Sequence, residues 1–414
     1  MNEGDKKLVD YNRLIKNVEH LVEAIEDAED AAATVHMVAD AVIAQFRDQL
    51  GLYGGRVYRR EGDEYILQST FGDAKEVPEG LRVSADYGPI RSLIQKRTLY
   101  MEADDPLLDR ELESQLGVQQ FVAIEVGDQD YILSFNVAPG YDKSSILFSL
   151  SILRHSINQK IRQERMADAL REARRIQASI LPRDNPEFAG FDICGRGVPM
   201  EAVGGDHFDF IPMTDKIMGL AIADVSGHGL PAALQVRDIY MGLRMGLGRD
   251  FKIVRTVERL NDIIHLSTLT SRFVSMVYGE LESSGNFVYV NCGHPAPFRL
   301  SADGSTKLLE RGGVVLGPIE DATYERGFVK IRPGDLLVLY TDGIIEATCR
   351  GEDGELEEFG LHRLIETARQ HRSESATEVI DAIFDRLEAY CNGAPAEDDR
   401  TLVVVKMPSG DGQQ

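Results

Sequence analysis

The chain has 414 residues, of which 43% are apolar, and this length is enough for two or three domains with sizeable cores. Its formal net charge is -23, from 68 acidic and 45 basic residues. A field of this sign argues against nucleic acid or an acidic membrane surface as a partner, and it suits either cation binding or simple solubility.

Cysteine usage and the amino terminus restrict the class of protein further. The four cysteines are widely separated and form no CxxC pair, so they predict neither a zinc site nor a disulfide framework. The opening residues MNEGDKKLVDYN lack the apolar stretch of a signal peptide. No apolar run approaches the roughly 20 residues that span a bilayer. We therefore expect a cytoplasmic protein without a membrane span.

Residues 8–47 alternate apolar and charged positions at helical spacing. Two apolar stripes carry this pattern: Leu14, Val18, Leu21, Val22 and Ile25, and then Val35, Val38, Val42 and Phe46. Short apolar runs follow, each bounded by Gly, Pro or Asp as strands are: RVYRR, EYILQST, LRVSA, TLYME, QQFVAIEV and DYILSFNVA. The pattern predicts a first domain over residues 1–142, with helices around a small, mostly antiparallel sheet.

Residues 143–184 form a predicted helical linker. An apolar stripe steps by three or four residues through Ile146, Leu150, Leu153, Ile157 and Ile161. After the polar break RQER it resumes through Met166, Leu170, Ala173, Ile176 and Ile180, and Pro182 ends it. A long helix with one apolar seam favours a coiled coil and hence a homodimer. The alternative is that its first half simply packs on the first domain.

Residues 185–408 have a different texture, with many strand-like runs and few helices. The expected strands are FDICGRGVP, HFDFIPM, IMGLAIADV, FVSMVYGEL, FVYVNCG, LLVLYTDG and TLVVVKM. Helices are expected at 231–248 and 251–269, and one late helix at 360–391. Because strands and helices do not alternate, the fold class is α+β. The tail at 409–414 is expected to be disordered.

Four segments of this region share one design, in which an apolar strand adjoins a turn of Asp and Gly. They are VGGD, ending at Asp206; AIAD, ending at Asp224; LVLYTDG, containing Asp342; and DDRT, beginning at Asp398. A strand end holds a side chain rigidly, and a neighbouring glycine admits close approach of a ligand or another backbone. Converging carboxylates would repel one another unless a cation lay between them, and oxygen ligands favour Mg²⁺ or Mn²⁺. Each segment alone is typical of an ordinary turn.

Together and in this order, the motifs resemble those of PPM-type metal-dependent protein phosphatases, in the bacterial branch of the sporulation phosphatase SpoIIE and the stress-response phosphatase RsbU. The resemblance covers residues 170–406 through RIQASILP, VGGDHFD, ADVSGHGLPAA, FVSMVYGEL, NCGHPAPF, GVVLG, GDLLVLYTDGIIEA, FG and DDRT. It implies a β-sandwich of two antiparallel sheets flanked by helices, with protein serine/threonine phosphatase activity.

The resemblance also implies which residues hold two divalent cations, Mn²⁺ or Mg²⁺. Asp206 matches the aspartate of GGD, and Asp224 opens DVSGHG and bridges both ions. Val225 lends its backbone carbonyl, while Asp342 and Asp398 match the aspartates of TDG and DDxT. The four aspartates are therefore the expected catalytic residues, serving a metal-activated water that attacks phosphorus.

Several nearby residues receive a structural interpretation. Asp399 is expected to orient its turn. His207 stands where an aromatic pair is usual and is expected on a strand face, with substrate contact or acid catalysis as the alternative. Cys292 stands where alanine is common and is expected to pack. His228 and His294 lie in glycine turns, with hydrogen bonding near the metals as the alternative to a structural role.

Residues 20–165 resemble a GAF-type sensory domain in the order of their elements, including a helix near 88–97, and a PAS-type domain is the alternative. The resemblance implies an unknown small ligand or a protein activator, against the alternative of a dimerisation module without a ligand. No cysteine precedes Cys194, which excludes a cysteine-linked bilin in this segment.

In this branch the usual substrate is a phosphorylated anti-sigma-factor antagonist with a STAS-type domain, and the resemblance implies such a partner. The main alternative is a catalytically degenerate, ligand-sensing dimeric scaffold, against which the presence of all four aspartates argues. A nucleotide phosphodiesterase is conceivable from carboxylates alone, but the ordered set of motifs argues against it.

Overall fold

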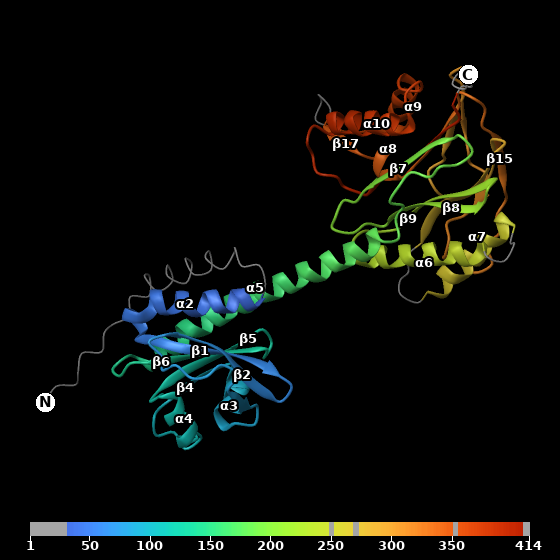
Figure 1. Ribbon diagram of the computed structural model, residues 1–414. Coiled ribbons are helices and arrows are strands. Elements are labelled where there is room, and N and C mark those ends of the chain that lie inside the picture. The colour runs from blue at the N-terminus through green and yellow to red at the C-terminus, as the bar shows by residue number, and fades with distance from the viewer. Residues whose placement is uncertain (1–30, 248–251, 268–272, 351–354, 409–414) are drawn as a thin grey trace. The chain divides into compact units, whose positions relative to one another are not determined.

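The computed structural model describes residues 31–247, 252–267, 273–350 and 355–408 (Figure 1). The chain divides into two compact units, Met1–Ala169 and Leu170–Gln414. The predicted stripe at 14–25 and the predicted tail at 409–414 lie outside the described residues, and the domain boundaries expected from the sequence stay predictions. Within the described ranges, no helix is long and apolar enough to cross a membrane.

The first unit is built on a six-stranded antiparallel sheet with the order β3-β2-β1-β6-β5-β4. All six apolar runs form its strands, which confirms that part of the prediction. The strands are β1 (Leu52–Glu61), β2 (Glu64–Gly72), β3 (Arg82–Ser84), β4 (Thr98–Met101), β5 (Phe121–Val126) and β6 (Tyr131–Val137). Short turns join β1 to β2 and β5 to β6, which makes both pairs hairpins.

Helices cover both faces of this sheet. Successive side chains of a strand point to opposite faces, so each face has its own set of apolar side chains to bury. Val57, Ile124 and Leu133 belong to the core under α2 (Ala31–Leu50) and α5 (Lys143–Ala178). The predicted stripe Val35, Val38, Val42 and Phe46 is buried in that core. Their neighbours Tyr58, Ala123 and Ile132 face the other side, toward α3 (Gly88–Lys96) and α4 (Arg110–Leu116). Figure 1 shows this arrangement of helices about the sheet.

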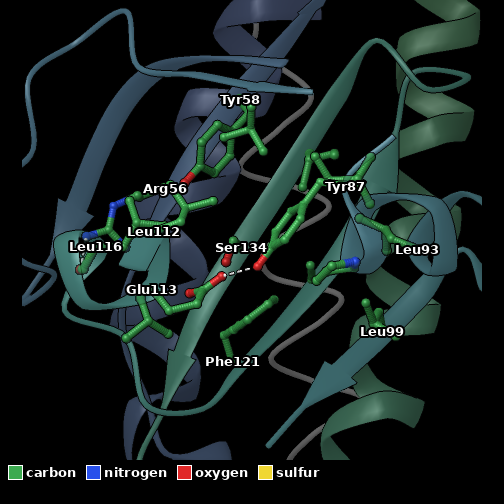
Figure 2. Close-up of a pocket in the computed structure, with 16 residues that line it drawn as sticks. Arg56, Tyr58, Tyr87, Leu93, Leu99, Leu112, Glu113, Leu116, Phe121 and Ser134 are labelled. Carbon is green, nitrogen blue, oxygen red and sulfur yellow. Dashed lines mark hydrogen bonds between the residues drawn. The ribbon is translucent and has the colours of Figure 1, made fainter. Parts of the chain in front are cut away.

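The face under α3 and α4 is incompletely filled, and a cavity lies between these helices and the sheet (Figure 2). The sequence did not predict α4. The helix begins at Asp109, whose carboxylate accepts hydrogen bonds from Glu111 N and Leu112 N, and Gly117 closes it in the left-handed conformation. These two capping residues were the overlooked signal.

Helix α5 begins in the first unit and ends in the second. Its predicted stripe from Ile146 to Ile161 is buried, whereas Met166 and Ile176 of the second stripe are 67% and 50% exposed. The helix ends at Ala178 because the next amides, Ser179 N and Ile180 N, turn back to carbonyls three residues earlier.

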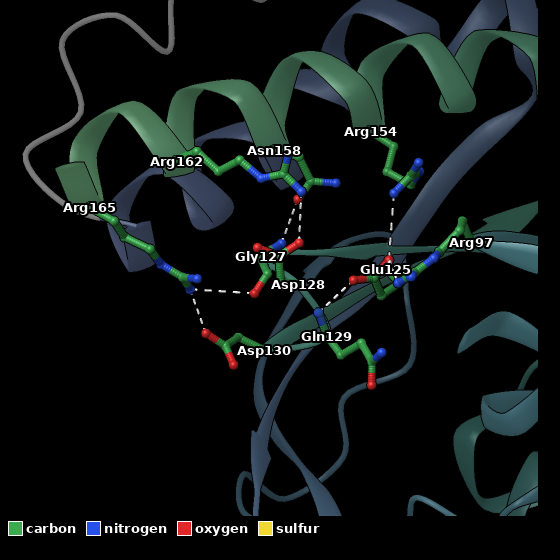
Figure 3. A network of polar contacts seen from close by, with 10 residues as sticks. All are labelled: Arg97, Glu125, Gly127, Asp128, Gln129, Asp130, Arg154, Asn158, Arg162 and Arg165. Carbon is green, nitrogen blue, oxygen red and sulfur yellow. Dashed lines mark hydrogen bonds and ion pairs between the residues drawn. The ribbon is translucent and has the colours of Figure 1, made fainter. Parts of the chain in front are cut away.

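Polar side chains of α5 also bind the β5–β6 turn (Figure 3). The contacts are Asn158 Oδ1 with Gly127 N at 2.6 Å, Arg162 with Asp128 at 2.9 Å, and Arg165 with Asp130. On β5, the carboxylate of Glu125 is almost fully buried and lies 3.5 Å from the guanidinium of Arg154 and 3.2 Å from that of Arg97. Arg97 caps α3, so Glu125 links α3 to α5.

The second unit is a sandwich of two sheets, as expected, but the first sheet is not wholly antiparallel, because β14 pairs parallel to β11. One has the order β14-β11-β10-β9-β8, with β15 beside β11, and the other has the order β13-β12-β16-β19-β7. Side chains from both sheets, including Phe208, Ile222, Leu339 and Val403, share one core. The strands of the first sheet are β8 (Asp206–Thr214), β9 (Ile217–Val225), β10 (Val274–Glu282), β11 (Asn286–Cys292), β14 (Gly312–Gly313) and β15 (Gly327–Lys330). Those of the second are β7 (Asp192–Val198), β12 (Phe298–Leu300), β13 (Thr306–Leu308), β16 (Leu336–Tyr340) and β19 (Arg400–Lys406).

Helices cover the outer faces of the sandwich. Helices α6 (Leu230–Leu247) and α7 (Ile253–Leu266) pack on the β8–β11 sheet. The other sheet carries α8 (Asp342–Ile345), α9 (Gly360–Gln370) and α10 (Ala376–Cys391), and a small hairpin of β17 (Thr348–Arg350) and β18 (Leu356–Glu358) lies nearby. The result is a four-layered unit in which the sandwich core is closed by helices on both sides.

The prediction of a single late helix at 360–391 was wrong. The segment forms α9 and α10, separated by a turn at 371–375. Ser375 starts the second helix with a capping box, in which Ser375 Oγ accepts from Glu378 N and Ser375 N donates to Glu378 Oε2 at 2.8 Å. The Ser-x-x-Glu signal was present in the sequence, but the continuous apolar periodicity concealed it.

This cap provides a test of what divides the two helices. Ser375→Ala should lower the free energy of unfolding of the second unit by about 1 kcal/mol, because an orphan amide of α10 loses its acceptor. The measurement is urea unfolding of the full chain. Ser373→Ala, at an exposed position in the same turn, is the matched control. Equal effects of the two substitutions would show that the cap does not stabilise the break.

Candidate active site

The four predicted aspartates lie at strand ends of the two sheets. Asp206 opens β8 and is paired directly with Asp224 near the end of β9. In the other sheet, Asp342 follows β16 and begins α8, while Asp398 precedes β19, the antiparallel neighbour of β16. The turn expected at TDG is therefore the first turn of a helix. Within each sheet, strand pairing brings the two aspartates to the same end of the sheet.

The aspartates of one sheet interact electrostatically with those of the other. Burial, together with the charges of Asp342 and Asp398, raises the pKa of Asp224 to about 7. Burial also raises the pKa of Asp206 well above its usual range, with Asp224 adding to the effect. The pKa of Asp342 is raised by burial and then by Asp398. The site thus gathers carboxylates whose ionisation burial and neighbouring charges oppose, and binding of a metal ion would relieve this repulsion.

Asp399 organises the loop that leads into β8. Its buried carboxylate accepts hydrogen bonds from Met200 N at 2.7 Å and Gly205 N at 2.6 Å, and a longer one from Asp206 N at 3.4 Å. Gly204 allows this approach, since a Cβ atom there would lie 2.5 Å from Asp399 Oδ2. Asp399 comes from the sheet of β19 and the loop leads into the sheet of β8, so this carboxylate fixes one pair of aspartates relative to the other.

Thr341 is a positioning residue that the sequence reasoning missed. It is fully buried, and its Oγ1 donates to Asp206 Oδ2 at 2.8 Å while accepting from Thr401 N at 2.9 Å. The threonines of the TDG and DDRT motifs were the available signal. Val225 N donates to Gly205 O at 3.2 Å, which places the β9 end against the GGD loop. Its carbonyl as a metal ligand stays a prediction.

The last turn of α5 also contacts this loop. The side-chain amide of Gln177 donates to Gly204 O at 2.6 Å and accepts from Gly204 N at 3.2 Å. Both backbone polar groups of Gly204, two residues before Asp206, are therefore held by one side chain of the linker helix.

The histidines and Cys292 are placed as follows. His207 is fully buried, neither ring nitrogen has a hydrogen-bond partner in the described part of the chain, and burial lowers its pKa to about 3. His294 is buried with Nδ1 2.7 Å from Ser275 Oγ, and burial likewise lowers its pKa to about 3. Both are neutral at ordinary pH, which favours the structural interpretation. His228 is exposed and lies 2.7 Å from Glu201, while Cys292 packs in the core.

The donor chemistry fits a hard divalent cation. The site offers carboxylate oxygens from both sheets and no soft ligand, which suits Mg²⁺ or Mn²⁺. As the side chains stand, no group of three or more His, Cys, Asp or Glu within the described ranges is arranged to hold a metal ion. Ligation therefore requires the aspartate side chains to turn toward a common point, which the repulsion between them opposes until a cation is bound.

Comparison with known proteins identifies relatives of this unit. The family model of stage II sporulation protein E (SpoIIE) matches residues 214–408. Phosphoserine phosphatase RsbU of Bacillus subtilis is 30% identical over 261 residues, covering 63% of this chain and 76% of the relative. Protein IcfG of Synechocystis is 28% identical over 339 residues, covering 72% of this chain but 51% of that protein. The chain thus spans three quarters of RsbU and about half of IcfG.

A solved structure supports the fold. The SiaA-PP2C domain of Pseudomonas aeruginosa matches with a TM-score of 0.51 and 20% identity, covering 59% of this chain and 98% of that one. At this identity the likeness shows the fold alone, and it agrees with the sandwich described above.

The contact between Gly204 and Asp399 can be tested directly. Gly204→Ala should lower the free energy of unfolding of the second unit by about 1–3 kcal/mol, because the added methyl group collides with a buried carboxylate. Urea unfolding measures this. Gly197→Ala should cost less, since a Cβ there would lie 3.1 Å from the hydroxyl of Thr401 and not 2.5 Å from a carboxylate. A Gly204→Ala variant with an unchanged free energy of unfolding would contradict the close approach.

Proposed function

The chain belongs to the SpoIIE/RsbU family of protein serine/threonine phosphatases, and from this we propose that it hydrolyses phosphoserine or phosphothreonine in a signalling protein with two divalent cations, Mn²⁺ or Mg²⁺. The observation that carries the proposal is the coupling of Asp224 to Asp342 and Asp398 across the two sheets. Mutually repelling carboxylates are retained at such a place when a cation binds between them.

In this proposal Asp206, Asp224, Asp342 and Asp398 hold the cations with their carboxylates, and Val225 contributes its backbone carbonyl. The bound cations would lower the pKa of the attacking water and neutralise the phosphoryl oxygens. Thr341 keeps the carboxylate of Asp206 oriented through its 2.8 Å hydrogen bond. These are roles of orientation and charge, so the chain needs no nucleophilic side chain.

We propose that the substrate is a phosphorylated anti-sigma-factor antagonist with a STAS-type domain. The 30% identity to RsbU over three quarters of its length supports phosphoserine as the group that is hydrolysed, because RsbU is named a phosphoserine phosphatase. The identity of the phosphorylated protein follows from the resemblance of the motifs. The alternative of a degenerate scaffold is disfavoured by the four carboxylates and by the hydrogen bonds of Thr341 and Asp399 that orient their strand ends.

We also propose that the first unit, a GAF-like sensor, regulates the phosphatase through α5. Two sets of contacts support this. The helix is bound to the β5–β6 turn by polar contacts at one end (Figure 3). At the other end Gln177 holds Gly204 of the GGD loop. The exposed Met166 and Ile176 between these contacts supply an apolar surface for pairing with a second copy in a homodimer.

The phosphatase proposal is tested by phosphate release from a phosphoserine peptide. Asp224→Asn should lower manganese-dependent turnover by at least about 100-fold, since changes merely beside a metal ligand cost 10–100-fold. Asp215→Asn, on the exposed β8–β9 turn, should retain activity. If the native chain is silent, residues 170–408, which keep Gln177, should be assayed alone, and inactivity there too would contradict an enzymatic role.

The proposal that α5 couples the first unit to the phosphatase predicts a change in the metal requirement. Gln177→Ala should raise the Mn²⁺ concentration needed for half-maximal activity and lower turnover by about tenfold, because Gly204 and the neighbouring Asp206 lose their support. Gln163→Ala, at an exposed position of the same helix, is the control. An unchanged metal requirement in Gln177→Ala would limit this contact to a structural role.

A further inference from the structure

We propose that His294 is a positioning residue for the metal centre and that it acts on Asp224 through the hydroxyl of Ser275. The inference rests on the proposed metal site, to which it adds the hydrogen-bond donor that orients one of the ligands. Both residues act on the ligand and not on the cation.

The neighbouring ends of β8, β9 and β10 place three polar side chains in one row. Asp224 on β9 is directly opposite Asp206 of β8 on one side and Ser275 of β10 on the other. Directly opposite residues of an antiparallel pair point to the same face, with Cβ atoms roughly 4.5–5.5 Å apart. Two positions along the same strands, Ile222 and Val277 belong to the core shared by both sheets, so the row points toward the other sheet. Asp224 therefore lies between a carboxylate that repels it and a hydroxyl that can bind it.

The hydroxyl of Ser275 is held by His294. Both side chains are buried, and Ser275 Oγ lies 2.7 Å from His294 Nδ1. Burial lowers the pKa of His294 to about 3, so the ring is neutral and carries one N–H. A hydroxyl can donate one hydrogen bond and accept two. If His294 donates from Nδ1, the hydroxyl hydrogen of Ser275 is left for the carboxylate of Asp224.

The turn that carries His294 is fixed by its own backbone contacts. Asn291 Oδ1 accepts from His294 N at 2.8 Å, and Asn291 Nδ2 donates to His294 O at 3.0 Å. Gly293 has a φ of 65°, and a Cβ atom there would lie 2.6 Å from Val315 Cγ1. The position of the imidazole is thus set by the chain, and the ring does not need the bond to Ser275 to stay in place.

The ring itself is poorly satisfied, which favours a role for the one bond that it makes. His294 Nε2 is buried and has no hydrogen-bond partner within the described residues. A buried polar atom without a partner is costly, and an apolar side chain would avoid that cost. The bond to Ser275 is the contact for which a histidine is needed at this position.

The consequence for the site follows from the other flank of the row. Thr341 Oγ1 already donates to Asp206 Oδ2 at 2.8 Å and so orients that carboxylate. Ser275 is the corresponding hydroxyl for Asp224, against which the carboxylate settles when it turns to bind a cation. Hydrogen-bond partners behind a metal ligand are typically worth about 10–100-fold in metal affinity.

The first test measures Mn²⁺ binding to the full chain without substrate, from the electron paramagnetic resonance signal of free Mn²⁺. Ser275→Ala should raise the dissociation constant of Mn²⁺ by about tenfold, because Asp224 loses the hydroxyl that orients it. Cys292→Ala is the control, since Cys292 is buried near the same turn but packs in the core on the other face of the sheet. An unchanged dissociation constant in Ser275→Ala would overturn the proposal.

The second test asks whether His294 acts through Ser275. His294→Leu should weaken Mn²⁺ binding as much as Ser275→Ala does, and the double variant should bind no more weakly than either, because both changes break one chain of hydrogen bonds. His294→Asn, whose side-chain amide can take the place of Nδ1, should restore most of the affinity. Losses that multiply in the double variant, or an Asn variant that behaves like Leu, would limit His294 to supporting the fold. Thermal unfolding checks each variant, and if His294→Leu does not fold, Ser275→Ala and His294→Asn decide the question.

Nitrogen-15 NMR of the histidine rings gives a readout that a purely structural role would not fix. A carboxylate only accepts hydrogen bonds, so Ser275 must donate to Asp224 and His294 must carry its hydrogen on Nδ1. We expect this tautomer. The other tautomer, in which Nε2–H would face the backbone of Tyr340 and Ser275 would donate to the ring, would overturn the proposal.

These measurements separate the positioning role from the phosphatase activity. Weaker Mn²⁺ binding by Ser275→Ala in a chain that releases no phosphate would sustain the role of His294 and contradict the phosphatase. Phosphate release by Ser275→Ala with native turnover and native metal requirement would sustain the phosphatase and contradict the role of His294. A native chain that binds no Mn²⁺ would overturn both.

Discussion

The site of the second unit depends on one buried carboxylate. Asp399 stands immediately before a strand of one sheet and accepts backbone N–H groups from the loop that opens a strand of the other. Each sheet aligns its own two aspartates by strand pairing, but pairing cannot set the distance between sheets. The hydrogen bonds of Asp399 supply that constraint, and Gly204 is required because no side chain fits beside the carboxylate.

The same end of the sandwich is charged and partly desolvated, which is unfavourable without a ligand. The charge of Asp398 adds to burial in raising the pKa of both Asp224 and Asp342, while hydrogen bonds of Thr341 and Asp399 join the strand ends of the two sheets. A fold that enforces repulsion in this way gains most from binding a cation, since the cation relieves it without any change of backbone. The family's phosphatase chemistry fits this arrangement.

In the first unit, helices cover both faces of the sheet. One face packs against α2 and α5 with a continuous apolar core. The other face keeps a cavity with two buried, oppositely charged side chains that do not meet. Glu125 joins these two sides, because it contacts Arg97 at the end of α3 and Arg154 on α5.

The sequence by itself predicted most of the elements and named four candidate aspartates. Periodicity located the six strands of the first sheet and the stripes of α2 and α5, and the Asp-Gly motifs identified four aspartates, since both signals lie in neighbouring residues. Prediction from the sequence failed where local signals competed, as at the break before Ser375 and at α4. Only the tertiary structure decided the roles of Asp399, Thr341 and Gln177 and the existence of the cavity. Asp399 and Gly205 are 194 positions apart, and Arg56 and Leu116 are 60 apart, so no local pattern records that they meet. Contacts of this kind depend on how whole sheets pack, which a short window of sequence does not contain.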